Sequence, residues 1–205
     1  MDAVIETPRL RLTRLTNTDL GSLHLAWFHK HWSDPVSTAW SSHGQCKTLE
    51  ESREWMKQRA TGNHILYAIH VKSKGGEHAD TPTEELGLVG NCGLRCVDTG
   101  PRLPPPAPPA SLTGMASTAD QRNAEPQPQP IRFRVLGYAL FETAWGKGYA
   151  TEACAALIDA YRSSSPSSSS TKEKEPVLNY LEANLHPDNV GSIRVLEKLG
   201  FQRVG

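Results

Sequence analysis

A glycine-rich turn at residues 145–152, with the sequence Trp-Gly-Lys-Gly-Tyr-Ala-Thr-Glu, is the part of the chain best suited to hold a ligand. It lies between a strand-like run at residues 132–141 and a helix-like run at residues 150–161. Gly146 and Gly148 leave backbone N–H groups uncovered by side chains. The helix that follows adds its own unpaired N–H groups and the positive end of its dipole. This combination predicts an anion site, suited above all to phosphate.

Two common phosphate-binding motifs do not fit this turn. A P-loop has the form G-x-x-x-x-G-K-[ST], but here Lys147 is followed by Gly148 and no hydroxyl stands in the required place. A dinucleotide fingerprint, G-x-G-x-x-G/A, would have Thr151 at its last position. It would also need an acidic residue about 20 residues further on, where this chain has a serine tract at residues 163–170.

A third comparison fits, and a second motif supports it. Trp145-x-x-Gly148-x-Ala150 resembles the [Q/R]-x-x-G-x-[G/A] acyl-CoA loop of the GNAT superfamily of N-acetyltransferases, and the tryptophan is similar to that of its RimJ/RimL branch. After a strand-like run at residues 178–185, residues 189–201 resemble the superfamily's N-x-x-S-x-x-x-x-E-K-x-G-F segment. Residues 6–10 also resemble the T-x-R-L-x-L-R opening of RimJ/RimL-like chains.

The second motif has a physical explanation of its own. Asp188 or Asn189 can cap a helix whose apolar positions share one face. Gly200 then follows the helix, and Phe201 returns the chain to the core. A capped amphipathic helix alone would explain the apolar face, but it would not explain Asn189 and Ser192 together.

The resemblance implies a mixed α/β fold, with a central, largely antiparallel sheet flanked by helices and a cofactor cleft where two strands splay. Local patterns add strands at residues 10–15, 65–71 and 86–97. They also add a helix from Leu20 capped by residues 17–19, and a helix through Arg59 that begins with a capping box at residues 48–51. Because the chain stops at Gly205, we expect the last strand to be missing and stability or acceptor binding to be weakened.

We expect a single domain over residues 1–205, interrupted by low-complexity insertions at residues 98–130 and 163–175. The first insertion is rich in proline, which prevents regular hydrogen bonding. Residues 102–108 match an R-x-x-P-x-x-P pattern that SH3-type domains bind, and a passive spacer is the alternative.

The resemblance also implies an activity, namely transfer of acetyl from acetyl-CoA to a primary amine, either a protein N-terminal α-amine or a small-molecule amine. On this interpretation one group of residues binds the cofactor through loop amides, a strand end and the later helix: Leu140, Phe141, Gly146, Lys147, Gly148, Tyr149, Ala150, Thr151, Asn189 and Ser192. Lys147 can equally be a solvated loop lysine, and Trp145 and Tyr149 can pack the loop against the core.

An amine must be neutral to attack a thioester. An α-amine with a pKa of about 7.7–8.0 loses its proton at neutral pH for about 1.4 kcal/mol, whereas a lysine amine near 10.4 requires about 4.6 kcal/mol. An α-amine acceptor is therefore compatible with a site that has only one weak base.

The candidates for catalysis are Glu142, Glu182 and Asn91, each of which also has a plain structural interpretation. His186, before Pro187, is a weaker candidate for a proton shuttle. Many GNAT enzymes have a tyrosine where this chain has Leu196, so the general acid stays unidentified.

Composition excludes several other functions. The formal net charge is zero, so nothing predicts attraction to nucleic acid or to an anionic membrane. The 4 cysteines lack metal-type spacing, so we expect no metal. A cytoplasmic location follows as the default, with the nucleus left open. Two alternatives remain: acylation of an antibiotic or polyamine, and a catalytically weak CoA-binding or scaffold protein whose proline-rich loop recruits partners.

Overall fold

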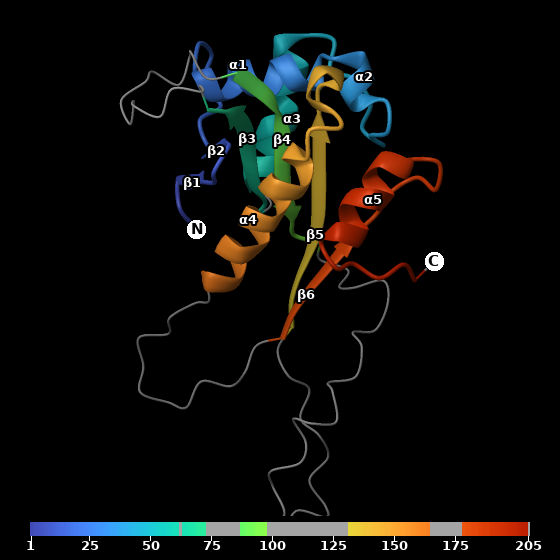
Figure 1. Cartoon of the computed structure of the whole chain (residues 1–205). Helices are drawn as coiled ribbons and strands as arrows, with labels where there is room; N and C mark the ends of the chain where they lie inside the picture. The colour runs from blue at the N-terminus through green and yellow to red at the C-terminus, as the bar shows by residue number, and fades with distance from the viewer. Residues whose placement is uncertain (62, 73–86, 98–130, 165–177, 205) are drawn as a thin grey trace, which may run out of the picture.

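The computed structural model describes residues 1–61, 63–72, 87–97, 131–164 and 178–204, which form one six-stranded sheet flanked by helices (Figure 1). The strands follow one another across the sheet in chain order. They are β1 (Val4–Glu6), β2 (Leu10–Arg14), β3 (Ile65–Val71), β4 (Gly87–Arg95), β5 (Ile131–Leu140) and β6 (Leu178–Ala183). Neighbouring strands are antiparallel except β5 and β6, which are parallel. The predicted mixed α/β fold with a largely antiparallel sheet is confirmed.

The helices are α1 (Leu23–Trp32), α2 (Pro35–Thr38), α3 (Leu49–Thr61), the 3-10 helix η3 (Glu142–Ala144), α4 (Tyr149–Ser163) and α5 (Val190–Lys198). The expected start of the first helix was wrong. Ser22 caps α1 by accepting from the amide of Leu25, whereas Asn17 accepts from the amide of Asp19 in the preceding turn. The short elements β1 and α2 were not predicted.

Two apolar clusters cover the two faces of the sheet. On one face, α4 and α5 pack against the central strands through Leu157 and Leu196. On the other face, α1 and α3 contribute Leu25, Phe28 and Met56 to a smaller cluster. Figure 1 shows α4 crossing the sheet and α5 lying beside β5 and β6. The turn between β5 and α4 therefore lies at the end of the sheet, where a ligand can reach it.

Two irregularities shape the sheet around the end of β5. The register of β3 and β4 shifts between Ile69 and His70, next to Gly90, whose φ is +155°. The parallel pairing of β5 with β6 ends at Leu136 opposite Ala183, although β5 continues to Leu140. Among the described residues, the last four of β5 consequently have no partner strand on that side.

Several expectations concern residues that the structure does not describe. The insertion at residues 98–130, including the pattern at residues 102–108, lies outside the described ranges, and so does most of the insertion at residues 163–175. Ser163 ends α4 and Ser164 is its C-cap. Residues 201–204 are irregular. Within the described ranges, every helix is too short or too polar to cross a lipid bilayer.

Replacing Gly90 with alanine tests the irregularity in β4. A Cβ atom at this position would lie 2.3 Å from the carbonyl oxygen of Ala139, and the backbone conformation also disfavours a side chain. Gly90→Ala should lower the free energy of unfolding by roughly 2–5 kcal/mol, measured by urea denaturation. The control is Gly137→Ala, because a Cβ there meets nothing within 4 Å. Equal stability of the two variants would contradict this account of β4.

Two buried histidines should make stability depend on pH. His31 and His70 are 1% and 0% exposed, and the ring nitrogens of His31 have no hydrogen-bond partner in the described ranges. Burial lowers the pKa of each to about 4. Between pH 6.5 and 4 the unfolded chain binds these protons and the folded chain does not, so stability should fall as the pH falls, by up to about 3 kcal/mol per ring.

Urea unfolding of His70→Leu over the same pH range measures this effect. The variant should lose less stability in acid than the wild type, whereas replacement of the exposed His186 by glutamine should change nothing. If the free energy of unfolding of His70→Leu fell with pH as steeply as that of the wild type, His70 would not be the source of the pH dependence.

Candidate active site

The glycine turn between β5 and α4 is exposed and has a conformation that requires glycine. Gly146 and Gly148 have φ values of +71° and +79°, in the left-handed region that other residues rarely adopt. Gly148 is the N-cap of α4, and no side chain caps the helix there. The predicted strand–turn–helix arrangement is therefore present, and α4 begins one residue earlier than expected.

Backbone N–H groups from 146 to 151 donate to no acceptor in the described part of the chain. The amide of Trp145, before them, donates to the Glu142 carbonyl, and the amide of Glu152, after them, donates to the Gly148 carbonyl. The first N–H groups of a helix have no intrahelical acceptor. The result is a continuous row of donors at the positive end of a helix, which is a good environment for an anion.

Trp145 fixes the turn to the end of β5. Its indole Nε1–H donates to the carbonyl of Leu140 at 2.8 Å, and the Ser37 hydroxyl reaches the same oxygen at 3.4 Å. The tryptophan is 50% exposed, so hydrogen bonding explains its position better than packing does.

Along the edge of β5 that β6 leaves unpaired within the described residues, every second residue directs its N–H and C=O groups outward. The amide of Phe141 donates to Val89 on β4, so Tyr138 and Leu140 direct their backbone groups to the opposite side. The Leu140 carbonyl is already used by Trp145. A ligand could therefore pair with this edge through the remaining groups of Tyr138 and Leu140.

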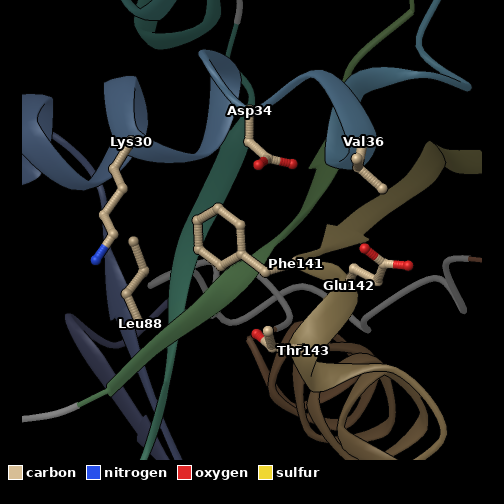
Figure 2. A pocket seen from close by; sticks show the side chains of 7 residues that line it. All are labelled: Lys30, Asp34, Val36, Leu88, Phe141, Glu142 and Thr143. Carbon is tan, nitrogen blue, oxygen red and sulfur yellow. The ribbon is translucent and has the colours of Figure 1, made fainter.

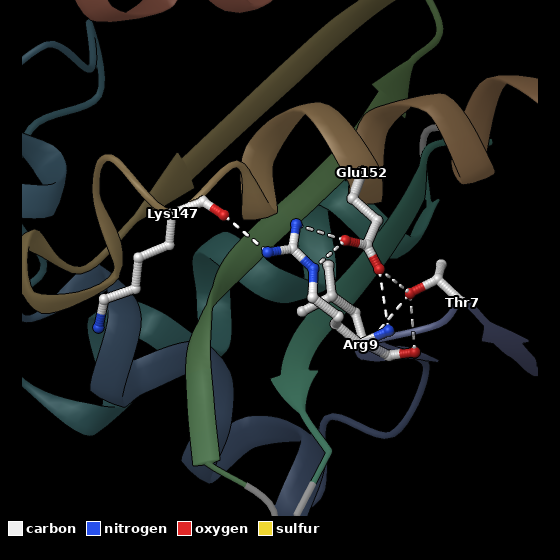
Figure 3. A network of polar contacts seen from close by, with 5 residues as sticks. Thr7, Arg9, Lys147 and Glu152 are labelled. Atoms are coloured by element: carbon white, nitrogen blue, oxygen red, sulfur yellow. Dashed lines mark hydrogen bonds and ion pairs between the residues drawn. The ribbon is translucent and has the colours of Figure 1, made fainter. Parts of the chain in front are cut away.

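Lys147 and Tyr149 both contact Arg9, Lys147 through its backbone carbonyl and Tyr149 through its ring. Figure 3 shows the Lys147 side chain pointing away from its backbone carbonyl, which accepts from Arg9. The ring of Tyr149 lies 4.9 Å from the guanidinium carbon of Arg9. Arg9 also binds Glu152 on α4. Sequence reasoning missed this role of Arg9, although residues 6–10 were recognised as part of a family pattern.

The two predicted cofactor residues at α5 also bind parts of the protein itself. Asn189 caps α5, because its Oδ1 accepts from the amide of Ser192 at 3.1 Å. The carbonyl of Ser192 accepts from the hydroxyl of Tyr138 at 3.1 Å. The start of α5 is thereby fixed beside the free edge of β5.

Glu142 lines a pocket of about 440 Å³ between α1, α2, β4 and η3. Figure 2 shows Asp34 and Lys30 on the helical side and Glu142 with Thr143 on the side of η3, around the ring of Phe141. Hydrogen bonds from Ser37 lower the pKa of Asp34, so it carries a negative charge. The Glu142 carboxylate has no partner within the described ranges and is exposed. This pocket was not predicted.

The three catalytic candidates do not form one cluster. Asn91 is 6% exposed, its Nδ2 has no partner in the described ranges, and it lies opposite Ala139 near the end of β5 that leads to Glu142. Glu182 lies opposite Val135 on β5. Val135 lies about 13 Å along the strand from Ala139, the residue opposite Asn91. His186 is exposed, with its ring beside Trp40, and its Nδ1 accepts from the amide of Asp188 at 3.3 Å. The structure therefore places Asn91 and Glu142 at one end of the sheet and Glu182 elsewhere.

Comparison with known proteins supports an acetyltransferase fold. The family model described as "Acetyltransferase (GNAT) domain" matches residues 9–202. A protein named "Uncharacterized N-acetyltransferase p20" from Bacillus licheniformis is 24% identical over 199 residues, covering 97% of this chain and 82% of that protein.

Solved structures resemble the fold at low sequence identity. A GNAT-family acetyltransferase from Bacillus anthracis has a TM-score of 0.57 and 17% identity, covering 98% of this chain and 85% of its own. The aminoglycoside acetyltransferase AAC(6')-Ib in complex with coenzyme A has a TM-score of 0.55 and 18% identity, covering 96% and 86%. The chain belongs to the GNAT family and is an acetyl-CoA-dependent acetyltransferase.

Proposed function

We propose that this enzyme transfers the acetyl group of acetyl-CoA to a primary amine, either a protein N-terminal α-amine or the amine of a small molecule. The observation that carries the proposal is the row of free N–H groups from 146 to 151 at the start of α4. These donors suit the diphosphate of the cosubstrate in number and in charge. The bound coenzyme A of AAC(6')-Ib, a structure of similar fold, supports this assignment by analogy.

The rest of the cosubstrate can follow the free edge of β5. Tyr138 and Leu140 offer backbone groups to the amides of a pantetheine arm. Asn189 and Ser192 lie at the start of α5, which Tyr138 links to the same edge. The thioester then lies near the end of β5, close to Phe141 and the pocket beside it.

The pocket beside Phe141 can accept the amine. Asp34 and Glu142 contribute negative charge, and Val36 and Leu88 contribute apolar surface. A protonated amine is attracted to such a site but must lose its proton before it attacks. An α-amine needs less help than a lysine amine, as its pKa is about 7.7–8.0 rather than 10.4.

Glu142 is the base that fits best, because its exposed carboxylate is unpaired within the described ranges and lines the pocket. It takes the amine proton directly or through a water. The neutral nitrogen attacks the thioester carbon, a C–N bond forms, the C–S bond breaks, and the second proton of the nitrogen passes through solvent to the departing thiolate. The side chain of Asn91 can orient the acceptor or a water from the same end of the sheet. Leu196 has a hydrocarbon side chain without an acidic proton, so it cannot protonate the thiolate.

Binding of coenzyme A tests the placement of the diphosphate. Gly148→Asp should reduce affinity at least a hundredfold, because it adds a negative charge and a side chain to the anion site. Isothermal titration with coenzyme A measures this. The control is Gly21→Asp before α1, where φ is +86° and a Cβ would meet nothing within 4 Å, whereas a Cβ at Gly148 would meet Nη2 of Arg9 at 3.4 Å. Retained affinity in Gly148→Asp would overturn the placement.

Turnover against a panel of peptides, lysine derivatives, polyamines and aminoglycosides tests the acceptor and the base. Glu142→Gln should lower kcat at least tenfold on the acceptor that reacts and leave the KM for acetyl-CoA unchanged. Glu54→Gln on α3 is the control, because that exposed carboxylate pairs with Lys57 at the surface, away from the pocket. Tight binding of coenzyme A with no turnover on any acceptor would favour the binding-protein alternative.

A further inference from the structure

A polar network joins the segment between β1 and β2 to the first turn of α4, directly beside the glycine turn (Figure 3). One carboxylate oxygen of Glu152 accepts from the hydroxyl of Thr7 at 2.6 Å and from the amide of Arg9 at 3.0 Å. The other accepts from Nε of Arg9 at 2.6 Å. The mechanism above does not use these residues.

The network is anchored in the sheet. The carbonyl of Arg9 accepts from the amide of Lys72 at 2.9 Å, and the amide of Leu10 donates to the hydroxyl of Thr7 at 2.8 Å. Arg9 therefore holds its guanidinium from a fixed backbone, although half of its side chain is exposed. The contact partners Arg9 and Glu152 are separated by 143 residues in the sequence.

Arg9 sets the orientation of one peptide in the glycine turn. Its Nη1 donates to the carbonyl of Lys147 at 2.9 Å. That carbonyl shares a peptide plane with the amide of Gly148, and in a trans peptide the two groups point in opposite directions. With the carbonyl directed to Arg9, the N–H of Gly148 is directed away from it, toward the exposed side of the turn.

Arg9 also balances an unfavourable charge. Burial acts to raise the pKa of Glu152, but the hydrogen bonds from Thr7 and Arg9 and the charge of Arg9 together lower it. Glu152 is therefore an anion in the first turn of α4, close to where the diphosphate would bind. Without a paired cation, that carboxylate would repel a bound anion.

We propose that Arg9 is a positioning residue for the cosubstrate's diphosphate, which directs the Gly148 amide outward and neutralises Glu152. The proposal rests on the proposed function, because it assumes that the turn binds this diphosphate. It predicts that Arg9 affects only ligands that carry the diphosphate. S-acetylpantetheine, which lacks the diphosphate and the nucleotide, should not respond to a change at Arg9.

Steady-state kinetics of Arg9→Met with the two acetyl donors tests this proposal. The KM for acetyl-CoA should rise at least tenfold, with kcat and the KM for S-acetylpantetheine changing less than twofold. Arg9→Lys keeps a cation for Glu152 but loses the fork that spans Glu152 and Lys147. For Arg9→Lys, the KM for acetyl-CoA should rise about threefold while the KM for S-acetylpantetheine changes less. This variant still tests the proposal if the methionine variant does not fold.

Arg53→Met is the matched control. Arg53 on α3 also joins distant segments, because its Nε donates to the carbonyl of Thr18, and it pairs with Glu50 on its own helix, but on the opposite face of the sheet. Its loss should lower the melting temperature without changing the KM ratio of the two donors. Equal losses on both donors in the Arg9 variants, or no loss, would overturn the proposal. A wild-type protein that fails to bind coenzyme A would instead overturn the proposed function.

Discussion

The site depends on one constraint: a row of backbone N–H groups from 146 to 151 lies at the surface without an acceptor among the described residues. Unpaired donors weaken a fold unless water or a ligand satisfies them. The turn exposes them by placing Gly146 and Gly148 in left-handed conformations. The helix dipole of α4 then makes the same place attractive to an anion. The proposed phosphate site is therefore formed by the backbone, and side chains serve mainly to hold it in position.

The surrounding structure holds this turn against the sheet from two sides. Trp145 binds the carbonyl of Leu140 at the end of β5, and Arg9 binds the carbonyl of Lys147 from the segment before β2. At the same end of β5, pairing with β6 stops at Ala183, so this part of β5 has no strand beside it on that side within the described residues. Within the described residues, the glycine turn, an unpaired strand edge and an acidic pocket thus meet at one end of the sheet, in the order in which a long cosubstrate and its acceptor would occupy them in the proposed function.

The sequence predicted the local parts of this arrangement and missed the contacts between distant segments. The glycine turn, the Asn189 cap and the glycine after α5 follow from residue types within a few positions of one another. The contact of Arg9 with Glu152 joins residues 143 positions apart, and no periodicity indicates it. The pocket lined by both Asp34 and Glu142 likewise joins residues far apart in the sequence, which no local pattern indicates. The cap of α1 is Ser22, not one of residues 17–19 as expected. Several neighbouring residues have side chains that can cap a helix, so residue type alone could not decide between them.

Titration of the ¹⁵N-labelled enzyme with coenzyme A, followed by the backbone amide resonances, tests the central claim most directly. The largest changes in amide chemical shift are expected at residues 146–151, with smaller changes along the free edge of β5 at Tyr138 and Leu140. Binding that leaves the amides of residues 146–151 unchanged, while resonances elsewhere respond, would contradict the claim that these backbone groups hold the diphosphate.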